Sequence, residues 1–106
     1  MRIGQLRYRI RIERIVENRN TFGEAEWGWE YFATVWAKVE SLRGRELVVS
    51  RQIFADVTTK FTIRFKPTIT SKMQILHRGK PYDIKFVDNV GEANRYLEIL
   101  AVEKFV

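Results

Sequence analysis

Hydrophobic and polar residues alternate along most of the chain with a period of two, which is typical of β-strands with one buried face. In the first such segment Tyr8, Ile10 and Ile12 alternate with arginines, and the longest segment spans residues 55–66. The alternation predicts six strands, at residues 7–13, 32–41, 55–66, 72–78, 82–87 and 96–103. Residues 78–81 have the composition of a hairpin turn. The chain is therefore predicted to be all-β, a small antiparallel barrel or sandwich.

Three stretches interrupt this alternation. It slips at Arg14, where a β-bulge would restore it. Residues 17–30 contain Gly23 and Gly28 among polar residues, so we expect a long turn there. Residues 45–52 are compatible with two helical turns or with a loop, because they have no period-two pattern.

The length and composition indicate one folded domain. A chain of 106 residues is too short for two self-supporting cores, so residues 1–106 are expected to form a single domain. The hydrophobic fraction of 45% and the aromatic fraction of 13% are those of a folded protein. No apolar run reaches the roughly 18 residues of a membrane span, and the first residues lack the apolar stretch of a secretory signal. We therefore predict no association with a membrane.

Candidates for catalytic or metal-binding residues are few. The absence of cysteine excludes thiol nucleophiles, disulfides and thiolate metal sites. His77 is the only histidine, which rules out a two-histidine metal site within one chain. Its place in a predicted strand indicates a half-exposed structural residue. The sequence predicts a protein that is not an enzyme and has no metal ion or cofactor.

Charge is unevenly distributed along the chain. The net charge is +6, yet residues 1–14 have a net charge of +4 and residues 17–30 a net charge of −3. A basic barrel with exposed aromatic residues would suit a nucleic acid, but the acidic stretch would repel phosphates. Tryptophan is enriched in protein interfaces, which favours a protein partner for that stretch, although ordinary solvent-exposed faces would have the same charges. The candidate interface residues are Arg7, Arg9, Arg11, Glu24, Glu26, Trp27, Trp29 and Glu30.

Three stretches in this order resemble a known family. The first has Gly4 and Leu6 before an arginine-rich strand with Arg9 and Ile10. The second reads Val35-Trp36-Ala37-x-Val39, continues with Gly44 and Glu46, and closes on Ile63-Arg64. The third is an apolar hairpin with Gly79, Tyr82 and Ile84. Together, from about residue 3 to residue 100, they resemble the siphophage head–tail joining family, the connector or stopper proteins of tailed bacteriophages and prophages.

The resemblance implies a structural protein of the virion. Members fold as a small β-barrel with one short helix and long loops. They form a ring, typically of twelve copies, at the portal vertex after DNA packaging. The ring lies between the portal or adaptor protein and the tail or tail-terminator protein, after assembly in the host cytoplasm. It closes the channel that holds the packaged double-stranded DNA.

The resemblance also places residues 42–55 in that channel. Arg43, Arg45 and Arg51 lie in or beside this segment. Guanidinium groups there would meet DNA phosphates at short range, or would pair with acidic residues of the neighbouring subunit. A small basic barrel that binds nucleic acid remains the alternative function.

Overall fold

The structure is a computed structural model that describes residues 5–42, 47–49, 52–54 and 56–104. Its elements are β1 (Tyr8–Arg19), β2 (Ala25–Ser41), β3 (Leu47–Val49), β4 (Gln52–Phe54), β5 (Thr59–Arg64), β6 (Met73–His77), β7 (Lys80–Asn89), the 3-10 turn η2 (Val90–Glu92) and β8 (Tyr96–Glu103). Among the described residues, no helix is long and apolar enough to cross a lipid bilayer.

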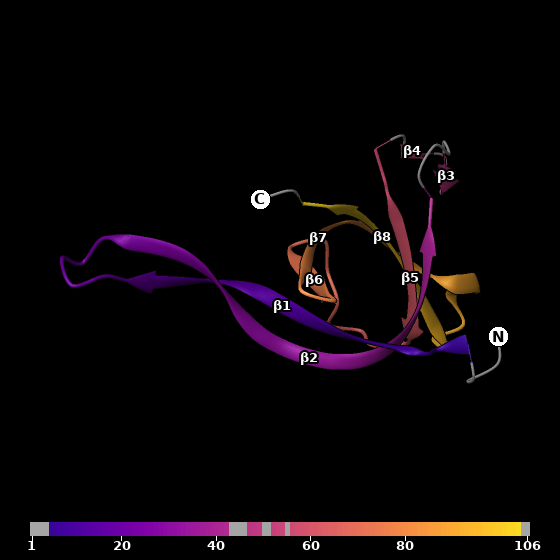
Figure 1. The fold of residues 1–106 in the computed structure, drawn as a ribbon, viewed down its shortest axis with the longest axis horizontal. Coiled ribbons are helices and arrows are strands. Elements are labelled where there is room, and N and C mark those ends of the chain that lie inside the picture. The colour runs from indigo at the N-terminus through magenta and orange to yellow at the C-terminus, as the bar shows by residue number, and fades with distance from the viewer. Residues whose placement is uncertain (1–4, 43–46, 50–51, 55, 105–106) are drawn as a thin grey trace.

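Six strands form a closed antiparallel barrel in the order β1-β2-β5-β8-β7-β6, and β6 pairs with β1 to close it. The short strands β3 and β4 form a separate two-stranded sheet (Figure 1). The predicted all-β barrel of about six strands is therefore confirmed. Strand β8 has the predicted bounds of residues 96–103, and both of its neighbours are barrel strands.

The barrel core consists of side chains from the inward positions of the six strands. Its fully buried members include Ile10, Ile12, Phe61, Ile63, Ile75 and Ile99. Burial of β-branched and aromatic side chains from every strand supplies most of the free energy that holds the barrel closed. The period-two pattern predicts inward side chains at Val57, Thr59, Phe61, Ile63 and Phe65. The first four are buried, Phe65 is only partly buried, and Thr62, which the pattern placed outward, is buried as well.

The long turn predicted for residues 17–30 is wrong. Strands β1 and β2 remain paired as far as Arg19 and Ala25, and only residues 20–24 turn. Asn18 and Gly28 are accommodated within the ribbon, because a pair of strands exposed on both faces does not require apolar residues. Residues 14–30, which we call the arm, therefore form a two-stranded ribbon that leaves the barrel after Arg14, the last residue of β1 paired with β6 (Figure 1).

The bulge lies near the predicted place but on the partner strand. Ile12 pairs with Ala33 whereas Glu13 pairs with Tyr31, so Phe32 of β2 is the extra residue. Ile15 is out of phase with the inward residues Ile10 and Ile12 because it lies in the arm, where neither face of the ribbon contacts the core.

The short helix that the resemblance implied is absent from the described residues. Within the stretch 45–52, residues 47–49 form strand β3, and Gln52 begins β4, which pairs with β3. Val48 and Val49 are β-branched and favour a strand over a helix. The helical alternative for 45–52 is thus wrong for the described part, and the described chain has only the short turn η2.

Candidate protein-interface site

The arm has two chemically different faces. Cross-strand pairs share a face, and Ile15 pairs with Trp29 while Glu17 pairs with Trp27. The opposite face contains the pairs Arg14–Glu30, Val16–Gly28 and Asn18–Glu26. The two predicted interface tryptophans therefore lie side by side along one face, on a strand and not in a loop.

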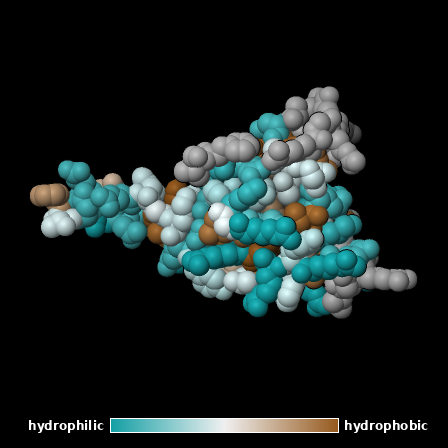
Figure 2. Space-filling model, viewed as in Figure 1, coloured by the Kyte–Doolittle hydropathy of each residue, from teal (hydrophilic) through white to brown (hydrophobic). Residues whose placement is uncertain are grey.

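Exposed aromatic side chains continue from the tip of the arm onto the barrel wall. Phe22, in the turn, is 87% exposed and Trp27 is 66% exposed. Further along β2, large parts of three more rings are exposed: Trp29, Tyr31 and Trp36. Figure 2 shows a mostly hydrophilic arm with a small hydrophobic patch at its far end. Exposed aromatic residues gathered in this way mark interaction surfaces.

The predicted basic row lies beside these rings. Arg7, Arg9 and Arg11 are all exposed at the start of the chain and of β1. The guanidinium carbon of Arg9 lies 5.5 Å from the centroid of the Trp36 ring, and that of Arg11 lies 4.9 Å from the Tyr31 ring. These cation–π contacts occupy one face of each ring, so the rings are not open stacking platforms for nucleobases on that face.

The base of the arm is held by a chain of hydrogen bonds. Gln74 Nε2 donates to Glu13 Oε1 at 2.8 Å, and Lys104 Nζ donates to Gln74 Oε1 at 2.9 Å. The same Lys104 ammonium lies 4.7 Å from the Trp29 ring centroid. Glu13 is only 7% exposed although its strand position predicted an outward side chain. The network thus connects β1, β6 and the C-terminal residues at the point where the arm leaves the barrel.

The tip of the arm is a structured turn. Asn20 Oδ1 accepts hydrogen bonds from the backbone N–H groups of Phe22 and Glu24, at 2.9 and 3.0 Å. Arg19 Nη1 donates to the Gly23 carbonyl at 2.8 Å, and Gly23 has a φ of 79°, which glycine adopts without strain. These bonds hold the Phe22 side chain outward at the end of the arm.

The predicted acidic patch is divided between two environments. Glu30 pairs with Arg14 within the arm, at 3.0 Å. Glu24 and Glu26 are exposed and form no ion pair with any residue that the structure describes. Their carboxylates are available to a partner.

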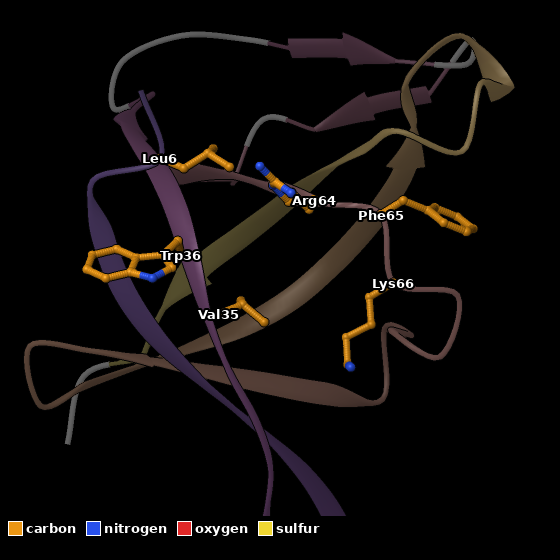
Figure 3. A pocket seen from close by; sticks show the side chains of 6 residues that line it. All are labelled: Leu6, Val35, Trp36, Arg64, Phe65 and Lys66. Atoms are coloured by element: carbon orange, nitrogen blue, oxygen red, sulfur yellow. The ribbon is translucent and has the colours of Figure 1, made fainter. Parts of the chain in front are cut away.

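A pocket of about 560 Å³ opens at the other end of β1 (Figure 3). Its lining is apolar except for two cationic side chains, and the residues are Leu6, Val35, Trp36, Arg64, Phe65 and Lys66. The sequence did not predict this pocket, because residues from three separate segments line it. The one signal in the sequence is a pair of cations, Arg64 and Lys66, flanking the last inward residue of the third predicted strand.

His77 is a core residue, contrary to the half-exposed position expected for it. It is 8% exposed, and its ring packs against Tyr8, Phe61 and Tyr82. Burial lowers the pKa of His77 below its usual 6.5, and the positive charges of Arg78 and Lys80 lower it further. Its Nδ1 atom has no hydrogen-bond partner among the described residues, and no cluster of metal-ligating side chains occurs among them.

The predicted channel residues Arg43, Arg45 and Arg51 lie outside the described residues. Their role stays a prediction.

Comparison with known proteins places the whole architecture in one family. The family model described as phage head completion protein matches residues 1–104. A Shigella flexneri 2a protein whose solution structure is known is 27% identical, with 97% of this chain and 96% of that chain aligned and a TM-score of 0.69. A chain from the virion of the native gene transfer agent particle has the same fold, with 19% identity, 92% of this chain and 94% of that chain aligned, and a TM-score of 0.62. No curated protein matches the chain.

The family match includes the barrel strands, the arm and the pocket residues. It agrees with the exposed aromatic and charged surfaces, which suit contacts between proteins. The chain belongs to the phage head completion protein family, a family of structural phage head proteins.

Proposed function

We propose that the chain is a head–tail connector of the stopper type. Copies of it assemble as a ring, typically of twelve, at the portal vertex after the DNA has been packaged. The ring contacts the portal or adaptor protein on the head side and the tail or tail-terminator protein on the other side. It closes the DNA channel and provides the surface to which the tail attaches.

One observation carries this proposal beyond the family match. The molecule has two different exposed surfaces, an acidic arm with aromatic residues and a basic strand face at the start of β1. Rings are built by heterologous contacts, in which one surface of each subunit meets a different surface of the next. Opposite charges on the two surfaces steer such contacts and set their orientation.

Retention of the packaged DNA is assigned to the segment 42–55. Arg43, Arg45 and Arg51 would be repeated in every copy of a ring, which concentrates positive charge around a common axis. Phosphates of a DNA end at that axis would bind there, with strong dependence on salt concentration. The virion is the expected site of action, and the host cytoplasm is the site of assembly.

Deletion of the gene from the phage or prophage tests the proposed function. We expect filled heads that lose DNA and have no tails, counted by electron microscopy, and restoration by the wild-type chain supplied in trans. Tailed particles that keep their DNA at the normal yield without the chain would contradict the proposal.

A charge-removing variant tests the DNA-facing segment separately. We expect particles with the variant Arg43→Gln/Arg45→Gln/Arg51→Gln to attach tails but to leak DNA, because only the phosphate contacts are lost. The matched control removes three exposed cations elsewhere, at Lys72, Lys85 and Arg95. Equal DNA retention in the two variants would show that the three arginines do not hold the DNA.

A further inference from the structure

We propose that the tip of the arm of one copy docks into the pocket of the next copy, with Phe22 inserted between the pocket walls. In this contact Glu24 and Glu26 face Arg64 and Lys66. The inference rests on the ring proposed above. The pocket adjoins the basic face of β1, because Arg9 lies over the ring of the pocket residue Trp36, so the acidic tip reaches that face when it enters the pocket. Its occupant is a second copy of this chain.

The arm and the pocket lie at opposite ends of the same strand. Leu6, which lines the pocket, precedes β1, and the tip follows the last residue of β1, Arg19. A strand of 12 residues spans about 40 Å at roughly 3.3 Å per residue. Figure 1 shows the arm extending away from the barrel, on the side opposite the N-terminal end of β1. The arm therefore projects away from the pocket of its own chain, and the tip of another copy is free to enter it.

The pocket suits an aromatic side chain. Its walls include Leu6, Val35, Trp36 and Phe65, and its volume of about 560 Å³ lies in the range of sites that enclose small organic groups. Phe22 is the most exposed large apolar side chain in the described part of the chain, at 87%. Transfer of its ring from water into an apolar pocket is favourable. The exposed Trp36 in the pocket wall offers an aromatic partner to this ring.

Charge selects the tip over a neutral apolar occupant. Arg64 and Lys66 form no ion pair with a residue that the structure describes, and neither do Glu24 and Glu26. Each side of the contact thus has two charges of one sign next to an apolar group. Pairing two cations with two acids fixes the orientation in which Phe22 enters.

Repetition of this contact joins the copies head to tail. The assembly closes into a ring when the rotations between successive copies add up to a full turn. One small contact of this kind buries less surface than the roughly 1,000 Å² that a stable interface needs. The ring therefore requires a template, such as the portal, that holds the copies side by side.

Cysteine cross-linking tests the docking directly, because the chain has no cysteine of its own. The variant Thr21→Cys/Thr68→Cys keeps both cations and places the second thiol on the exposed residue two positions after Lys66. Incorporated into particles and treated with a short thiol cross-linker, it should give a ladder of covalent multimers on a non-reducing gel. The control Thr21→Cys/Lys85→Cys places the second thiol on β7, outside the pocket, and should give monomers.

Variants at the contact supply a second readout. Phe22→Ala should lower incorporation into particles about tenfold or more, whereas the neighbouring Thr21→Ala should not, and both should fold as judged by circular dichroism. Glu24→Lys/Glu26→Lys should also lower incorporation, and adding Arg64→Glu/Lys66→Glu should restore it.

The outcomes separate the two proposals. Tailed particles that contain the chain but give no ladder, and that tolerate Phe22→Ala, would overturn the docking and leave the connector function standing. Normal particles after deletion of the gene would overturn the connector function itself.

Discussion

Three exposed rings of β2 each have a cation on one face, namely Trp36 with Arg9, Tyr31 with Arg11, and Trp29 with Lys104. Each cation–π contact at an exposed site contributes about 0.5–1 kcal/mol to the stability of the fold. Their larger effect is on orientation, because a ring held on one face has less rotamer freedom to lose when a partner binds its other face. In the proposed interface, these single contacts orient the rings in the free subunit.

Loss of Gln74 should destabilise the barrel. Gln74→Ala removes the donor to the buried Glu13 carboxylate and the acceptor for Lys104, so we expect the free energy of unfolding to fall by about 2–3 kcal/mol. Urea unfolding measures this, with the exposed Glu24→Gln as the control that changes it by less than about 0.5 kcal/mol. An equally small effect of Gln74→Ala would show that water replaces the network.

Acidification should destabilise the protein through His77. Its pKa in the folded state is lowered below the usual 6.5 by burial and by the charges of Arg78 and Lys80. As the pH falls through 6.5 the unfolded chain takes up a proton that the folded chain does not yet bind, so stability falls with the pH in this window. Urea unfolding at about pH 7.5 and about pH 5.5 should show a smaller loss for His77→Phe than for the wild type. An identical loss in both proteins would assign the pH dependence to other groups.

The arm is the element that gives this barrel its asymmetric shape. A free two-stranded ribbon is marginally stable in water, but this one continues two barrel strands and is anchored at its base by Glu13, Gln74 and Lys104. None of the residues 14–30 is buried, so the core does not depend on them. The arm is therefore free to make the contacts outside the subunit that are proposed above.

Removal of the arm should leave a folded barrel. Replacing residues 15–29 by an Asn-Gly turn between Arg14 and Glu30 keeps the strand register and supplies the favoured two-residue hairpin turn. We expect a loss of about 1 kcal/mol in stability, chiefly from the Lys104–Trp29 contact, and an unchanged β-type circular dichroism spectrum. An unfolded product would show that the arm belongs to the folding unit.

At the scale of the whole molecule, an elongated body of 49 × 27 × 26 Å has an acidic arm and an otherwise basic surface. The opposite charges favour head-to-tail association, but exposed pairs of this kind are weak and are screened by salt. The shape and the charges together suit a subunit that assembles where other proteins hold it in place.

The purified chain should therefore be a monomer or a loose oligomer. Size-exclusion chromatography with light scattering measures its mass, and any association should decrease between low and high salt. A stable closed ring formed by the chain alone would contradict the need for a template.

Local sequence determined that there are six barrel strands and fixed many of the residues that point into the core. Phe61, Ile63 and Ile99 lie where the period-two pattern placed them, since a half-buried strand needs apolar residues at every second position. The hairpin predicted at residues 78–81 is present, but its turn is only Arg78 and Gly79, which both have positive φ, and Lys80 already begins β7.

Tertiary structure alone decided the arm, the pocket and the network at Glu13. A ribbon exposed on both faces lacks the alternation that burial imposes, so residues 17–30 read as a turn although they mostly form strands. The pocket joins residues that precede β1, lie in β2 and end β5, and no local pattern contains that juxtaposition. Glu13 is buried because β6 brings Gln74 beside it, a pairing set by closure of the barrel.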